Sequence, residues 1–140
     1  MRAPRPGYSG KSLVTKLGLK PGQRLLAIDA PQGYADLVGP LPDAASLDLC
    51  AWAHACAGAE IVHVFIGQRA TLAERAAKLV ALPGPGGSVW ISWPKKASPL
   101  HRDLTDNAVR ALILPTGWVD VKVAAVDADW SGLKFVRRRA

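Results

Sequence analysis

The chain has 140 residues, a formal net charge of +7 and a hydrophobic content of 49%. A chain of this length forms one domain and buries roughly 68–70% of its unfolded surface, so it needs no disulfide or metal to fold. No apolar run approaches the ~20 residues of a membrane-spanning helix, and the first residues, MRAPRPGYSGKS, lack the apolar core of a secretory signal. We therefore expect a cytoplasmic protein with no membrane partner.

Basic residues are concentrated at the two ends of the chain. Residues 1–24 carry six basic residues and no acid, and residues 130–140 carry four basic residues and no acid. Such ends attract phosphate groups independently of sequence, so nucleic acid bound through the basic termini is one hypothesis. Solvated tails are the favoured alternative, because aromatic residues do not alternate with the charges as a stacking platform requires.

The first half of the chain alternates short helices and apolar strands. Residues 1–10, rich in proline, glycine and arginine, are predicted to form an extended basic arm, and residues 11–140 a single domain. In chain order, the pattern predicts a helix over Lys11–Leu17 that ends at Gly18, a strand over Arg24–Asp29, a helix over Tyr34–Val38, a strand over Ser46–Ala51 and a strand over Ile61–Ile66. The Ala-rich continuation to Gly58 fits a helix equally well.

The second half begins with a helical crossover. Leu72, Ala76, Leu79 and Val80 recur at helical spacing, so this stripe is predicted to pack on a sheet. A strand over Val89–Trp93 is predicted to follow. The next element is a helix that is capped by Asp103 or Thr105 and runs to Ile113, with Leu104, Ala108 and Leu112 on one face. The last elements are a strand over Trp118–Val126 and its hairpin partner over Leu133–Val136.

Five segments carry a resemblance to known families: KLGLKPGQRLLAIDAPQGY, AEIVHVFIGQRATLAER, VWISWPKKAS, DLTDNAVR and GWVDVKVAAVDADWSGLKFVRR. They resemble a family of small bacterial proteins that share a domain of unknown function. More distantly, the order of elements is similar to a shortened class I S-adenosylmethionine-dependent methyltransferase core. That similarity implies a small Rossmann-like, three-layer α/β fold, with a mostly parallel sheet and a C-terminal antiparallel hairpin strand.

The loop after the first strand departs from the methyltransferase pattern. Such enzymes place a glycine-rich loop there and an acidic residue after the second strand. Here Asp29 precedes a loop with the single glycine Gly33, Pro31 removes a backbone donor, and no acid lies immediately after the predicted strand Ser46–Ala51. No cofactor is therefore predicted, and S-adenosylmethionine is kept as the alternative. Asp29 is expected to stabilise the turn.

The carboxyl ends of parallel strands are where open α/β sheets bind ligands, so three loops form the candidate site. The candidate ligand-binding residues are Asp29, Gln32, Gly33 and Tyr34 in the first loop, Arg69 in the second, and Ser92, Trp93, Lys95 and Lys96 in the third. Lys95 and Lys96 would bind an anion, with Arg69 adding charge; solvated lysines are the alternative.

Other groupings of reactive residue types are incomplete. Ser9–Ser12 ends like a phosphate-binding loop but lacks its first glycine, and Cys50, His54 and Cys56 lack a fourth metal ligand. His63 alternates with valines and is predicted to be a hydrogen-bonded sheet histidine. Ser98, His101 and Asp103 have no nucleophile elbow, so no hydrolase and no metal are predicted.

Three functional hypotheses remain. The leading one is a non-catalytic module that binds a small anionic molecule or a protein partner at the carboxyl ends of its strands. The others are an atypical S-adenosylmethionine-dependent transferase and a nucleic-acid-associated protein that uses its basic termini.

Overall fold

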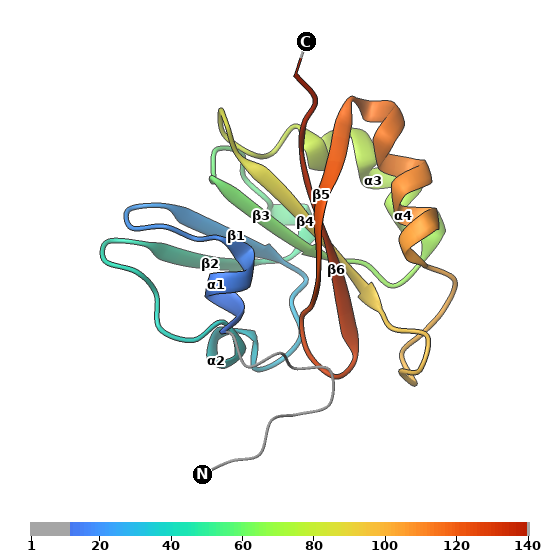
Figure 1. Cartoon of the computed structure of the whole chain (residues 1–140), viewed down its shortest axis with the longest axis horizontal. Helices are drawn as coiled ribbons and strands as arrows, with labels where there is room; N and C mark the ends of the chain where they lie inside the picture. The colour runs from blue at the N-terminus through green and yellow to red at the C-terminus, as the bar shows by residue number, and fades with distance from the viewer. Residues whose placement is uncertain (1–11, 140) are drawn as a thin grey trace.

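Six strands form one mixed sheet in the order β2-β1-β3-β4-β6-β5 in the computed structural model, which describes residues 12–139 (Figure 1). The strands are β1 (Arg24–Ile28), β2 (Ser46–Cys50), β3 (Ile61–Phe65), β4 (Ser88–Pro94), β5 (Trp118–Ala125) and β6 (Trp130–Arg137). The strands β1 to β4 pair in parallel, whereas β6 runs antiparallel to both β4 and β5. The expected parallel sheet with a C-terminal hairpin strand is confirmed.

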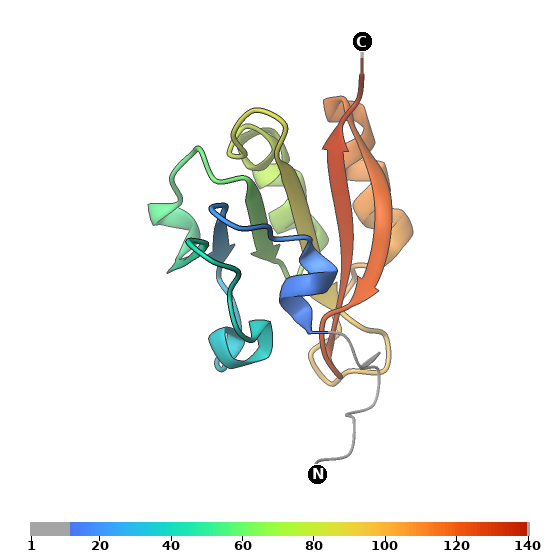
Figure 2. The same cartoon turned by 60° about the vertical axis from the view of Figure 1, so that its left-hand side comes forward.

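Helices cover both faces of the sheet, which makes three layers (Figure 2). The helices are α1 (Leu13–Leu17), α2 (Tyr34–Val38), α3 (Arg69–Val80) and α4 (Asp106–Ile113), with 3-10 turns at η1 (Trp52–His54) and η2 (Leu114–Thr116). Helices α1 and α2 pack on one face, and α3 and α4 on the other. None of the helices between residues 12 and 139 is long and apolar enough to cross a membrane.

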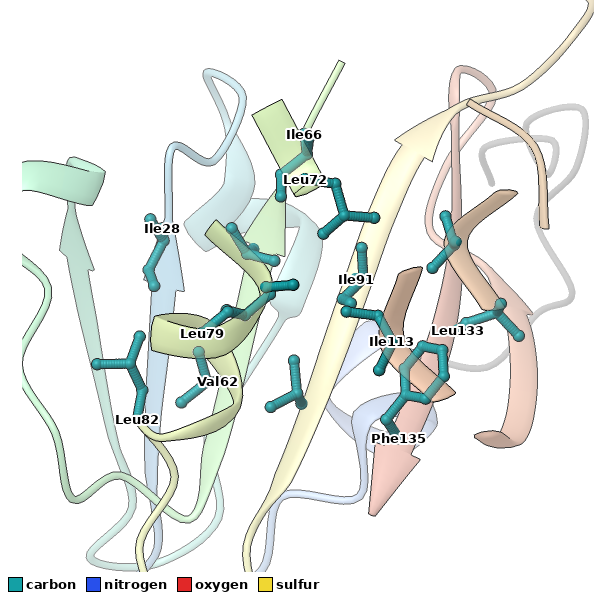
Figure 3. Close-up of a cluster of buried hydrophobic side chains, with 14 of the residues drawn as sticks. Ile28, Val62, Ile66, Leu72, Leu79, Leu82, Ile91, Ile113, Leu133 and Phe135 are labelled. Atoms are coloured by element: carbon teal, nitrogen blue, oxygen red, sulfur yellow. The ribbon is translucent and has the colours of Figure 1, made fainter. Parts of the chain in front are cut away.

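Adjacent residues of β4 serve the two halves of the core. Trp90 faces α1 and α2, and its indole N–H donates to the carbonyl oxygen of Leu17 at 3.2 Å. Ile91 faces α3 and α4, where Leu72 and Leu79 pack over the sheet (Figure 3). Trp90 and Ile91 are both 0% exposed, as expected for a strand covered on both faces.

The predicted elements agree with the structure apart from details at their ends. Gly18 ends α1 with φ of 82°, a left-handed conformation that glycine adopts without steric cost. The chain after β2 forms the short turn η1, so its Ala-rich continuation is not a long helix. Lys11 and the predicted extended arm lie outside the described residues.

The structure selects one of the two predicted caps of α4 and corrects its predicted buried face. Thr105, not Asp103, is the N-cap, because the Thr105 hydroxyl accepts the N–H of Ala108 at 3.2 Å. The fully buried residues within α4 are Val109 and Ile113, whereas the predicted Ala108 and Leu112 are only partly buried. The predicted Leu104 is buried, but it precedes the helix. The helix packs against both α3 and the β5–β6 hairpin, which rotates its buried stripe by one residue.

Candidate functional site

The carboxyl ends of β1 and β2 border a pocket of about 440 Å³. Ile28 pairs with Cys50 in the parallel register, so the chain leaves both strands at the same edge of the sheet. One wall consists of residues 29–36, and the other consists of Leu49, Cys50 and Ala51. This is the position in which open α/β sheets hold ligands.

Asp29 fixes the backbone at the mouth of the pocket. Its φ of 55° lies in the left-handed region, which costs a non-glycine residue about 1–2 kcal/mol. Its N–H donates to the carbonyl oxygen of Cys50 at 2.9 Å, and its carboxylate accepts the backbone N–H of Trp52 at 3.2 Å. The other carboxylate oxygen accepts a hydrogen bond from Arg75 at 3.3 Å. Asp29 therefore ties the first loop to η1 and to α3.

Trp52 and two cations complete this attachment. The guanidinium of Arg75 lies 4.8 Å from the Trp52 ring centroid, and the ammonium of Lys78 lies 5.2 Å from it. Cations over an indole face are held by the ring quadrupole. Arg75 is thus engaged by a carboxylate and a ring together, which leaves it poorly placed to bind a further anion.

The lining of the pocket carries negative charge. Asp29 and Asp36 are its two carboxylates, and no cationic side chain from the described residues 12–139 lines it. Burial, with a smaller contribution from the charge of Asp29, raises the pKa of the Cys50 thiol. Cys50 is therefore protonated at neutral pH and is not an activated nucleophile.

A buried hydrogen-bonded chain runs under the first loop into the sheet. The Tyr34 hydroxyl lies 2.7 Å from Nδ1 of His63, and Nε2 of His63 lies 2.7 Å from the hydroxyl of Ser92. Exposure is 2% for Tyr34 and 0% for His63 and Ser92. Burial lowers the pKa of His63 to about 3 and raises the pKa of Tyr34, so both side chains are neutral at physiological pH.

The uncharged hydrogen-bonded chain Tyr34–His63–Ser92 has a structural role. A neutral imidazole has one N–H, so one hydroxyl donates to the ring and the other accepts from it. His63 is the hydrogen-bonded sheet histidine that the strand pattern predicts. The sequence did not reveal that its partners are Tyr34 and Ser92, two candidate ligand-binding residues. The only available signal was that His63 and Ser92 belong to adjacent predicted strands.

The remaining candidate residues lie away from the pocket. Arg69 is exposed, and its backbone N–H donates to the carboxylate of Asp103 at 2.8 Å. Trp93 is 5% exposed, Lys95 is partly exposed and Lys96 is exposed. Strand β3 separates β4 from β1, and none of these residues lines the pocket. The structure thus brings together Asp29, Gln32, Gly33 and Tyr34 around the pocket, and Arg69, Trp93, Lys95 and Lys96 lie outside it. Ser92 is buried beneath the pocket and joined to Tyr34 through His63.

The loop after β4 is fastened to the β5–β6 hairpin. The backbone N–H of Lys95 donates to the carbonyl oxygen of Asp129 at 2.7 Å, and the Ser98 hydroxyl donates to the carboxylate of Asp129 at 2.9 Å. His101 Nδ1 lies 3.3 Å from the carbonyl oxygen of Pro94. Since Ser98, His101 and Asp103 each have separate partners, they do not form a catalytic triad.

The other sequence groupings gain no support from the geometry. Among residues 12–139, no three His, Cys, Asp or Glu side chains are grouped to hold a metal ion. Of the Ser9–Ser12 segment only Ser12 is described, and it acts as the N-cap of α1.

Comparisons with known proteins define the class of fold. The chain is similar to a protein from Bordetella parapertussis described as a possible exported protein, with a TM-score of 0.65 at 12% identity over 91% of this chain and 66% of that one. Fibrillarin from Methanococcus jannaschii, a pre-rRNA processing protein, gives 0.63 at 12% identity over 97% and 77% of the two chains. Fibrillarin from Aeropyrum pernix, solved with natively bound S-adenosyl-L-methionine, gives 0.55 at 13% identity over 89% and 73%.

The chain therefore has the fold of the class I S-adenosylmethionine-dependent methyltransferases. No protein-family model matches the sequence, and no curated protein matches it. The resemblance to a family of small bacterial proteins stays a prediction.

Proposed function

We propose that this chain is a binding module with a methyltransferase-like fold, which holds a small polar molecule in the pocket between the β1–α2 loop and the end of β2. The observation that carries the proposal is the pairing of Asp29 with Arg75 and with the Trp52 N–H. The pocket lies where open α/β sheets bind ligands, whereas the Asp29 carboxylate at its mouth is hydrogen-bonded to other residues of the protein.

The charge of the lining favours one chemical class of ligand. Asp36 is an exposed carboxylate with no ion pair among residues 12–139, and Leu49 supplies an apolar wall that is 56% exposed. A molecule with an apolar ring and a cationic or neutral donor group matches this lining. An anion would meet the unpaired carboxylate of Asp36, and no cationic side chain from residues 12–139 lines the pocket to attract it. The predicted anionic ligand is therefore assigned to Lys95 and Lys96, outside the pocket.

Methyl transfer is the second candidate, and the likeness to a fibrillarin with natively bound S-adenosyl-L-methionine supports it. The residues present fit that molecule poorly. Ala51 follows β2 where the resemblance implies an acid for the ribose hydroxyls, and Pro31 offers the loop no N–H. Asp48, the nearest carboxylate in sequence, lies within β2 itself. We therefore derive no reaction step through this cofactor.

Native mass spectrometry of the full chain purified from its host tests the proposal. We expect a retained small molecule that is released when Leu49→Glu places a third carboxylate in the pocket wall. Leu100→Glu is the matched control, because Leu100 is also exposed, at 48%, and lies outside the pocket. Retention by both variants, or by neither, would contradict the assignment to this pocket.

A melting experiment separates the two candidates. A ligand present at 100 times its Kd stabilises a fold by about 2.7 kcal/mol, which a melting curve resolves readily. We expect millimolar S-adenosylmethionine or S-adenosylhomocysteine to leave the Tm unchanged. A reproducible increase would favour the transferase.

A further inference from the structure

A group of lysines surrounds the C-terminal end of α1, on the sheet face that α1 and α2 cover. We call the residues Lys16, Lys20, Lys122 and Lys134 the lysine face. Lys122 of β5 and Lys134 of β6 are directly opposite each other in the antiparallel register, and Lys134 is in turn opposite Trp90. Residues directly opposite each other share a face, so both lysines lie on the α1 side of the sheet.

Short contacts bring the lysines of different segments together. The ammonium of Lys122 donates to the carbonyl oxygen of Lys16 at 3.1 Å, and the ammonium of Lys16 donates to the carbonyl oxygen of Ala125 at 2.9 Å. The ammonium of Lys134 lies 3.7 Å from the point that a Cβ on Gly18 would occupy. Three segments far apart in the sequence thus direct positive charge to one place.

No carboxylate among residues 12–139 forms an ion pair with Lys20, Lys122 or Lys134. The four ion pairs in this part of the chain all use arginine. Like charges directly opposite each other destabilise a β-ladder. Burial, followed by the charges of Lys95 and Lys122, lowers the pKa of Lys16, and burial, followed by Lys122 and Lys20, lowers the pKa of Lys134.

A purely structural role explains only part of the arrangement. A single lysine suffices to satisfy a carbonyl oxygen at the end of a helix, and Lys122 does this. Lys16 likewise donates to the carbonyl oxygen of Ala125, whereas Lys20 and Lys134 add repulsion without an evident gain in stability. Where a fold keeps a locally unfavourable arrangement such as these close like charges, the arrangement usually serves a binding function.

We propose that the lysine face binds a phosphate-rich anion, whose charges pair with the ammonium groups of Lys20, Lys122 and Lys134. Several neighbouring ammonium groups match a ligand with several negative charges better than they match one carboxylate, and ammonium groups bind phosphate as point charges. Two sources share this chemistry, the backbone of a nucleic acid and a free polyphosphate chain. The site goes beyond the proposed function, because none of its residues lines the pocket at β1 and β2.

The test uses the full chain, with sodium tripolyphosphate and a short labelled single-stranded RNA as separate probes. Binding is measured at several salt concentrations for the wild type and for the variant Lys122→Gln/Lys134→Gln. Lys78→Gln/Arg102→Gln is the matched control, because it removes the same charge from two exposed residues outside the lysine face. Melting curves check that each variant is folded.

We expect Lys122→Gln/Lys134→Gln to lose at least tenfold in affinity for the probe that binds, and to lower the slope of log affinity against log salt by about 1 to 2. The control is expected to stay within about threefold of the wild type, as rim charges act mainly through long-range attraction. The variant should melt close to the wild type in the absence of a probe, because the removed repulsion offsets the lost hydrogen bond from Lys122 to the carbonyl oxygen of Lys16.

Each outcome decides the proposal. Binding of RNA alone with these losses identifies a nucleic-acid backbone as the source, and binding of tripolyphosphate alone identifies a free polyphosphate. Equal losses in the control, or unchanged affinity in the lysine variant, would overturn the proposal and direct attention to the basic termini. A wild type that binds neither probe at low salt would overturn it as well.

Discussion

The hydroxyl of Tyr34 lies 2.7 Å from Nδ1 of His63, and this contact joins the first residue of α2 to the centre of the sheet. The pocket loop ends at Tyr34, so the position of the loop depends on a hydrogen bond buried in the core. Ser92 completes the chain on the far side of the imidazole. Stability and the shape of the pocket are therefore coupled through one histidine.

Tyr34→Phe is expected to lower the free energy of unfolding by about 1–3 kcal/mol, because it leaves a buried nitrogen of His63 without a partner. The change removes one oxygen and keeps the ring that packs on Phe65. Urea denaturation measures the effect. Ser92→Ala should cost a similar amount, and a loss near zero in both variants would show that the hydrogen-bonded chain contributes no stability.

His63 is expected to make the fold sensitive to mild acid. Its folded pKa of about 3 lies below the ordinary value of 6.5, so the unfolded state takes up the proton first as pH falls. Stability is therefore fully present above about pH 6.5 and is lost toward pH 3, by roughly 1.4 kcal/mol per pH unit within that window.

Urea unfolding at pH 7, 6 and 5 measures this dependence above the range in which most carboxylates titrate. His63→Gln should show a shallower dependence on pH, even where it is less stable at pH 7. An identical pH dependence in the two proteins would mean that His63 is not the group responsible.

Substitutions at Asp29 are expected to separate backbone conformation from charge. Asp29→Asn tolerates the positive φ and keeps an oxygen for the Trp52 N–H, so it should cost less than about 1 kcal/mol, as for an exposed ion pair. Asp29→Ala loses both partners and retains the unfavourable φ, and should cost clearly more. Chemical denaturation ranks the two variants, and equal costs would argue against the role of Asp29 as a tether.

The turn before β4 is expected to accept no side chain at Gly87. A Cβ there would lie 2.7 Å from the carbonyl oxygen of Glu60 and 2.9 Å from that of Gly84, so Gly87→Ala should destabilise the fold by about 1–3 kcal/mol. Gly67→Ala is the matched control, because a Cβ at Gly67 meets no atom within 4 Å. Thermal melts of both variants test the difference, which should vanish if the turn can shift.

The sequence by itself was sufficient to predict most of the fold. Apolar periodicity located the strands and helices, since the spacing of buried residues follows directly from the geometry of each element. The predicted strand Val89–Trp93 buries both Trp90 and Ile91, because a parallel strand covered by helices has no exposed face. The C-terminal hairpin followed from alternation on both sides of a turn rich in aspartate.

Only the tertiary structure decided how the candidate site is divided. Position after a strand identified the loops, but strand order places β3 between β1 and β4, so Asp29 and Lys95 are not neighbours and only Asp29 lines the pocket. The partners of His63 and the lysine pair across β5 and β6 depend on register between segments distant in the chain. Local sequence patterns determine which face of a strand or helix a residue occupies. Strand order and register determine which residues lie beside it, and these depend on how the whole chain packs.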